Sequence, residues 1–123
     1  MREDDPLTAD AVTNPVRDED GAFRPDFLTR VTDAIAAEDR PALKQAIEGL
    51  HEADLGDLIE ALESEDDRPR LIELLGKDFD FTALTELDET IRVQILLALK
   101  PWIVADGIRD LDSDDAVYIL EDL

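Results

Sequence analysis

Eight aliphatic residues recur along this chain at a nearly constant interval, and this interval constrains the fold more than any other feature. The spacings are 12, 12, 13, 12, 12, 12 and 12 residues, along the series Ile35, Ile47, Ile59, Ile72, Leu84, Leu96, Ile108 and Leu120. A leucine follows each of them three residues later, from Leu50 to Leu123. The one exception is the first repeat, where this position is Glu38. Twelve residues make about 3.3 helical turns, so one continuous helix cannot hold both rows on a fixed face. The chain must therefore turn once per repeat.

Composition indicates a single domain whose core is built from leucine and isoleucine. The 123 residues are 44% hydrophobic but include only one Trp, one Tyr and four Phe. No cysteine is present, which excludes disulfides and thiolate metal sites and suits a reducing compartment. The N-terminus lacks the apolar stretch of a secretory signal, and no run approaches the roughly 18 apolar residues of a membrane span. We expect the chain to be soluble.

The charge is strongly acidic. Thirty-three acidic against 12 basic residues give a formal net charge of −21. Such a surface repels nucleic acid and anionic lipid headgroups and attracts cations or basic partners. Three interpretations stay open: solvated helix faces, adaptation to a salty cytosol, and a function that uses a divalent cation.

Residues 1–25 contain several prolines among acidic residues and no apolar periodicity. We interpret them as a flexible acidic leader. The helical pattern begins at Asp26 and continues to the last residue, so the predicted domain covers residues 26–123.

Start and stop signals divide that domain into eight short helices. Pro41 suits a first helical turn capped by Asp39, and Gly49 is expected to end that helix. Ser64 and Asp67 resemble a capping box, and Gly76 is the next stop signal. The remaining expected starts are His51, Asp80 or Thr82, Asp88, Pro101-Trp102, and Asp112 or Ser113.

Helices of about 8 to 10 residues are too short to be stable alone in water. We therefore expect an all-α superhelix in which 24-residue helical hairpins stack through their Ile/Leu stripes. The turn around residues 63–67 should absorb the one 13-residue interval, and Trp102 is expected to wedge between hairpins. The apolar face of Val117, Leu120 and Leu123 has no polar cap after it. We expect another helix or a partner to cover this face, and the chain to be the N-terminal part of a longer protein.

The ordered segments of the chain resemble a known family. Residues 50–62, LHEADLGDLIEAL, are similar to the "LHPADLADLLEAL" signature of the N-terminal cytosolic domain of MgtE-type magnesium transporters. Pro101-Trp102 and the run of residues 111–123 resemble later segments of that domain, in the same order and at nearly the same spacing. The resemblance covers about residues 27–123. It implies a right-handed superhelix of short helices, an armadillo-like α-solenoid.

The resemblance also implies a regulatory function. In that family the domain precedes a pair of CBS domains and a dimeric, membrane-embedded Mg²⁺ channel. Intracellular Mg²⁺ bound between acidic faces of the N-terminal and CBS domains favours the closed channel. We therefore expect a cytosolic Mg²⁺-sensing domain at the cytoplasmic side of the inner membrane. Its partners would be the CBS and channel domains of the same polypeptide, which would be a homodimer at full length.

The resemblance places an acidic metal-binding position on Asp114, with Asp115 and Asp112 beside it. The alternative is that these residues only cap a helix start and interact favourably with its dipole. A second acidic position of the family falls on Thr82, which cannot supply a carboxylate. Three nearby acidic residues are candidates to replace it: Asp78, Asp80 and Glu86.

Other interpretations of these residues are weaker. Asp110, Asp112, Asp114 and Glu121 occupy ligand positions of an EF-hand-like loop, but Asp115 stands where the sharp turn needs glycine. The repeat also places residues 116–123 in a helix. His51 is expected at a helix start. Because no activated nucleophile, phosphate loop or sugar platform is evident, we do not expect an enzyme. The alternative function is a structural interaction module, similar to the middle domain of flagellar motor switch proteins.

Overall fold

The computed structural model describes residues 16–122, which fold almost entirely into short helices. The described part of the chain has no β-strand, only an isolated bridge between Arg17 and Phe23. The α-helices are α2 (Pro25–Ala37), α3 (Arg40–Ile47), α4 (Glu52–Ala61), α5 (Asp67–Leu75), α6 (Glu89–Ala98), α7 (Pro101–Arg109) and α8 (Ser113–Leu120), and the 3₁₀ helices are η1 (Gly76–Asp78) and η2 (Phe81–Glu86). The all-α class predicted from the repeat is confirmed. Residues 1–15 of the predicted leader lie outside the described residues.

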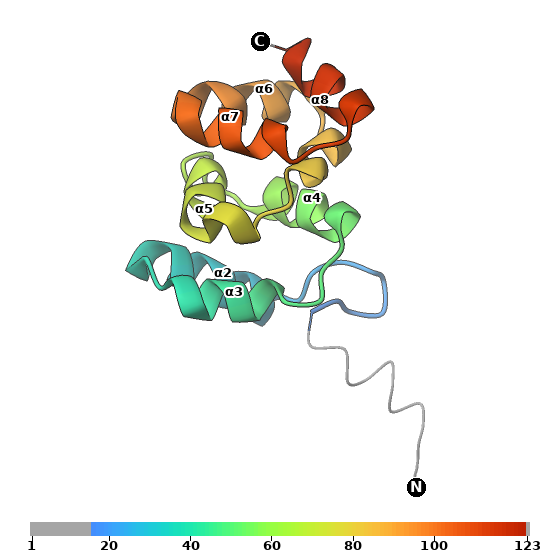
Figure 1. Ribbon diagram of the computed structural model, residues 1–123. Helices are drawn as coiled ribbons and strands as arrows, with labels where there is room; N and C mark the ends of the chain where they lie inside the picture. Colours follow the sequence, from blue (N-terminus) through green and yellow to red (C-terminus); the bar gives the residue numbers. More distant parts are fainter. Residues whose placement is uncertain (1–15, 123) are drawn as a thin grey trace, which may run out of the picture.

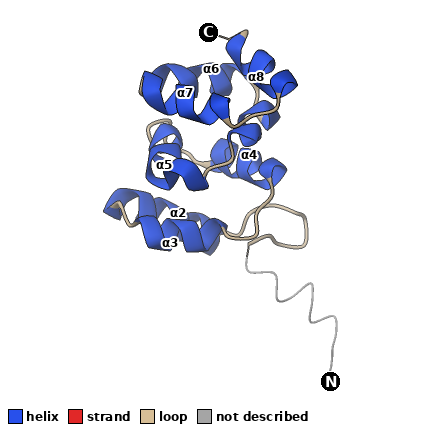
Figure 2. Cartoon of the chain, in the orientation of Figure 1, coloured by secondary structure: helices blue, strands red, loops and turns tan. Residues whose placement is uncertain are grey.

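The helices stack in chain order (Figures 1 and 2). α2 and α3 lie side by side at one end, α4 and α5 lie in the middle, and α6, α7 and α8 lie at the other end (Figure 1). Successive layers are in contact, because α5 packs against α2, α3 and α6, and η2 packs against α4 and α8. This arrangement is the stacked architecture that the repeat predicts. The right-handed sense of the superhelix stays a prediction.

Most of the predicted start and stop signals are confirmed. The side chains of Asp39, Asp80 and Asp88 each accept a hydrogen bond from a backbone N–H of the following helix, at 3.1, 2.9 and 3.1 Å. Gly76 follows the last residue of α5 with a φ of +55°, a value that favours glycine.

The capping box predicted at Ser64 is wrong. α5 begins only at Asp67, and the residue before it, Asp66, makes no side-chain capping bond. The backbone N–H of Asp67 instead donates to the carbonyl of Ser64 at 3.1 Å. Residues 62–66 form the connection between α4 and α5, where the additional residue of the 13-residue interval was expected. Ser64 therefore belongs to the turn.

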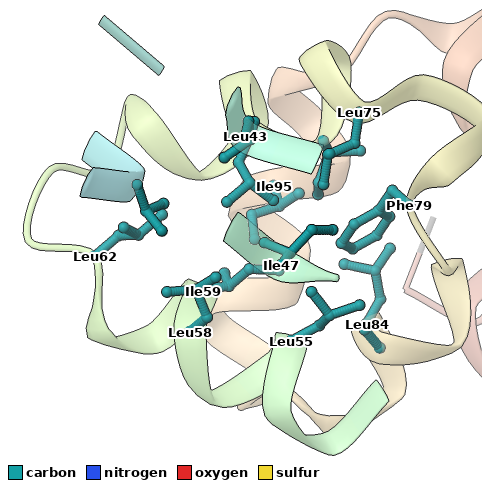
Figure 3. Close-up of a cluster of buried hydrophobic side chains, with 14 of the residues drawn as sticks. Leu43, Ile47, Leu55, Leu58, Ile59, Leu62, Leu75, Phe79, Leu84 and Ile95 are labelled. Atoms are coloured by element: carbon teal, nitrogen blue, oxygen red, sulfur yellow. The ribbon is translucent and has the colours of Figure 1, made fainter. Parts of the chain in front are cut away.

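The repeat residues form the core along most of the stack. Figure 3 shows Ile47, Ile59 and Leu84 packed among other buried aliphatic side chains. Six of the eight repeat positions are buried: Ile35, Ile47, Ile59, Ile72, Leu84 and Leu96. The last two differ, since Ile108 is only half-buried and Leu120 is 51% exposed. On α8 the fully buried residue is Ile119, one position before the repeat residue.

Several apolar side chains near the C-terminal end of the stack are exposed. Val117 and Leu120 lie on the face that was predicted to be uncovered, and Leu123 lies outside the described residues. Trp102 is 63% exposed at the start of α7, so the prediction of a wedge between hairpins is wrong. Among residues 16–122, no helix combines the length and apolar character needed to cross a membrane.

The segment before α2 is held against the helical stack by Arg17 and Phe23. The guanidinium of Arg17 lies 4.2 Å from the centroid of the Phe23 ring, which stacks on Phe27. The same guanidinium donates hydrogen bonds to Asp54 and Asp57 of α4, at 2.8 and 3.2 Å. This cation therefore joins residues 16–24 to the second layer of helices.

Candidate metal-binding site

The three predicted metal ligands lie at the start of α8. Asp112 is the residue before the helix, and its carbonyl oxygen accepts a hydrogen bond from the backbone N–H of Ala116 at 2.9 Å. Its side chain makes no capping bond. Asp114 and Asp115 occupy the first turn, where carboxylates are stabilised by the partial positive charge of the helix N-terminus. The helix start that the sequence predicted here is confirmed.

These carboxylates do not converge on a common point. Asp112 and Asp114 are exposed, and Asp115 is half-buried. Neighbouring helical residues are rotated by about 100° from each other, so Asp114 and Asp115 project in different directions. Within residues 16–122, no three Asp, Glu, His or Cys side chains are grouped so as to hold a metal ion. The arrangement offers single carboxylates to an approaching group.

The EF-hand-like interpretation does not fit this geometry. α8 includes residues 113–120, which would form most of the binding loop and would have to be non-helical there.

The acidic residues proposed for the second metal-binding position do not form a common site either. Thr82 lies on η2, and its backbone N–H donates to the Asp80 carboxylate, which therefore serves as a helix cap. Asp78 is engaged in an exposed ion pair with Lys44 at 3.6 Å. These two replacements for the missing carboxylate thus have local partners.

A buried arginine fixes the position of α8. Arg92 on α6 is 4% exposed, pairs with Asp122 and donates to the carbonyl of Leu87 at 3.0 Å. Its guanidinium also lies 4.6 Å from the centroid of the Tyr118 ring. Burial alone would lower the pKa of Arg92, but the hydrogen bond and the charge of Asp122 outweigh it and raise the pKa above its ordinary value. Together with buried Ile119, these contacts hold the helix that carries the candidate ligands.

Sequence reasoning missed Arg92. It stands between Ile91 and Val93 in an apolar segment and looks like any solvated cation of an amphipathic helix. The signal that could have identified it is its place three residues before Ile95, on the face that this buried residue defines.

The family comparison agrees with the resemblance found in the sequence. The family model described as the MgtE intracellular N domain matches residues 50–123, from just before α4 to the end of the chain. No curated protein and no solved structure gave a match. The matched family belongs to transporters and is not an enzyme family. The chain therefore belongs to the family of the MgtE intracellular N domain, the N-terminal domain of MgtE magnesium transporters.

Proposed function

We propose that this domain senses Mg²⁺ and regulates an MgtE-type channel. Mg²⁺ would bind at an acidic interface between this domain and the CBS domains of the transporter and would favour the closed channel. Asp114 is the proposed principal ligand, with Asp115 and Asp112 beside it. The observation that carries the proposal is the family membership, together with the exposed carboxylates of Asp112 and Asp114 at the start of α8.

The charge of the chain supplies a physical basis for such a switch. A net charge of −21 makes the approach of a second acidic surface unfavourable without a cation between them. Mg²⁺ keeps several of its waters and usually takes one or two carboxylates from a protein surface. Exposed single carboxylates such as Asp114 suit this kind of bridging, because a partner surface can supply the other ligands. Occupancy would then shift the equilibrium toward the bridged state by its difference in affinity for the two states.

The attachment of α8 also supports the proposal. A bridging ion holds two domains in one arrangement more precisely when its ligands are on rigid elements. Ile119 is fully buried and Arg92 pairs with Asp122, so the helix carrying Asp114 is fixed to the stack at its other end.

The test uses this domain together with the CBS domains of the transporter. Melting temperature is followed while Mg²⁺ is added, with K⁺ salt at matched ionic strength as the control. We expect Mg²⁺ to raise the melting temperature more than K⁺ does. The double variant Asp114→Asn/Asp115→Asn should remove most of that difference.

Asp33→Asn/Glu65→Gln is the matched control variant, because it removes the same charge from exposed positions elsewhere. It should keep the Mg²⁺ response. Equal effects of Mg²⁺ and matched K⁺ would overturn the proposal and would favour salt adaptation as the reason for the acidity.

A further inference from the structure

A groove of about 710 Å³ lies beside α7, separate from the candidate metal ligands at the start of α8. One side is formed by Trp102 and other residues of α7, and the other side by η1 and the residues on either side of it. The groove thus spans two successive layers of the stack. Its volume is in the range of sites that bind small ligands or short peptide segments.

The floor of the groove is apolar. Phe79 and Phe81 are each 5% exposed, and their rings meet edge to face at a centroid distance of 5.8 Å. Gly107 lets α7 approach this pair, because a Cβ atom there would lie only 2.4 Å from the Phe81 ring. Half-buried Ile103 and Leu111 extend the apolar lining.

Trp102 is the exposed apolar side chain of the groove lining. It is 63% exposed and is the only tryptophan of the chain. Tryptophan buries a large apolar area, and its ring face attracts arginine and lysine. Tryptophan is enriched among the side chains that contribute most to binding at protein interfaces, so an exposed tryptophan beside an apolar groove suits a binding surface.

The rim of the groove is acidic. Its lining contains five acidic residues and only two basic ones, Lys77 and Arg109. Arg109 is already paired with Asp106 at 2.9 Å. Among residues 16–122, neither Glu73 nor Asp110 has an ion-pair partner. The groove therefore combines an apolar floor with negative charge that is not neutralised.

We propose that this groove binds a basic amphipathic peptide segment, with its apolar side chains on Trp102 and the groove floor and its Lys and Arg side chains at the acidic rim. Charge complementarity selects this occupant. A second copy of the chain would bring a further net charge of −21 to the same surface. The groove does not depend on the Mg²⁺ function proposed above, because the proposed Mg²⁺ ligands do not include Trp102, Glu73 or Asp110.

Trp102 gives a direct signal for the test. The probe is a peptide of about 14 residues made of Leu, Lys and Arg, without Trp or Tyr, with Leu at helical spacing. Titration into the chain should shift the Trp102 emission to shorter wavelength and saturate. A scrambled peptide of the same composition has no apolar face and should bind at least about tenfold more weakly.

The rim is tested with Glu73→Gln/Asp110→Asn, using a labelled peptide and fluorescence anisotropy. Removing the half-buried charge of Glu73 and the exposed charge of Asp110, which would both meet cations of the peptide, should weaken binding about threefold to tenfold. Asp33→Asn/Glu65→Gln removes the same charge from exposed positions outside the groove and should leave the affinity within about twofold.

Three results would each overturn the proposal. The first is equal affinity for the amphipathic and scrambled peptides, and the second is an equal loss of affinity in the rim and control variants. The third is a Trp102 shift produced by Mg²⁺ at matched ionic strength and not by the peptide, which would make the groove a cation site.

Discussion

Arg92 and Asp122 form an ion pair whose side chains are only 4% and 9% exposed, and it joins α6 to the residues that follow α8. The guanidinium also donates to Leu87 and lies against the Tyr118 ring. A buried cation that has lost its partner is strongly destabilising, whereas an intact pair contributes little compared with apolar packing. The contact therefore matters most when one of its two members is changed.

Asp122→Asn should lower the free energy of unfolding by about 3 kcal/mol, because it leaves the buried Arg92 charge without its counterion. Urea unfolding followed by helical circular dichroism measures this loss. Glu121→Gln, at the exposed neighbouring acid, is the matched control and should change stability by less than about 0.5 kcal/mol. Similar losses in the two variants would mean that the ion pair does not secure α8.

A second prediction concerns Asp54 and the stability at acidic pH. The hydrogen bond from Arg17 lowers the pKa of Asp54 below its ordinary value, burial opposes this, and the bond from the His51 backbone N–H adds to the lowering. A carboxyl with a lower pKa in the folded state stabilises the protein above its unfolded pKa, near 4, and loses that contribution as pH falls through the folded value.

Wild-type protein should therefore lose stability below about pH 4 more steeply than Asp54→Asn, which lacks this titration. Thermal unfolding between neutral and acidic pH measures the difference. Glu52→Gln, an exposed acid in the same first turn of α4, should keep the wild-type pH dependence. Parallel curves for wild type and Asp54→Asn would contradict the assigned role of the Arg17 contact.

The repeat makes a third prediction, on two leucines that sequence alone treats as equivalent. Leu84 is fully buried, while Leu120 is 51% exposed. Leu84→Ala should cost about 2 to 5 kcal/mol of unfolding free energy through lost burial and the cavity left behind. Leu120→Ala should cost less than about 1 kcal/mol. Urea unfolding of both variants measures these two losses of unfolding free energy. Equal losses would show that Leu120 is covered in solution.

The repeat predicted the fold well because each short helix begins, ends and stacks in the same way, and nearby residues determine where it begins and ends. Caps such as Asp39 and Asp88 act on the next few residues, so their effect can be read from sequence. The pattern fails where burial depends on what lies on both sides of a helix. At the end of the stack Ile119 is buried and Leu120 is not, and Trp102 points to solvent.

The candidate site was predicted only in part for a related reason. The sequence located the helix start that carries Asp112, Asp114 and Asp115. It could not reveal that Asp115 is half-buried while Asp112 and Asp114 are exposed, since the exposure of each side chain depends on how the helix is docked. The sequence did not identify Arg92, which holds α8 in place, because its partner Asp122 is 30 residues away. Contacts over such distances leave no periodic trace in one sequence.

The last prediction tests the close packing of α7 on the aromatic pair. A Cβ atom at Gly107 would lie 2.4 Å from the Phe81 ring, which is 5% exposed and has little room to move. Gly107→Ala should therefore destabilise the protein by about 1 to 3 kcal/mol, although alanine favours helices. Combined with Phe81→Leu, which removes the ring, the same change should cost much less, so urea unfolding of the double-mutant cycle should show coupling of about 1 kcal/mol or more. Additive losses would contradict the contact, because they would place the cost of Gly107→Ala somewhere other than the Phe81 ring.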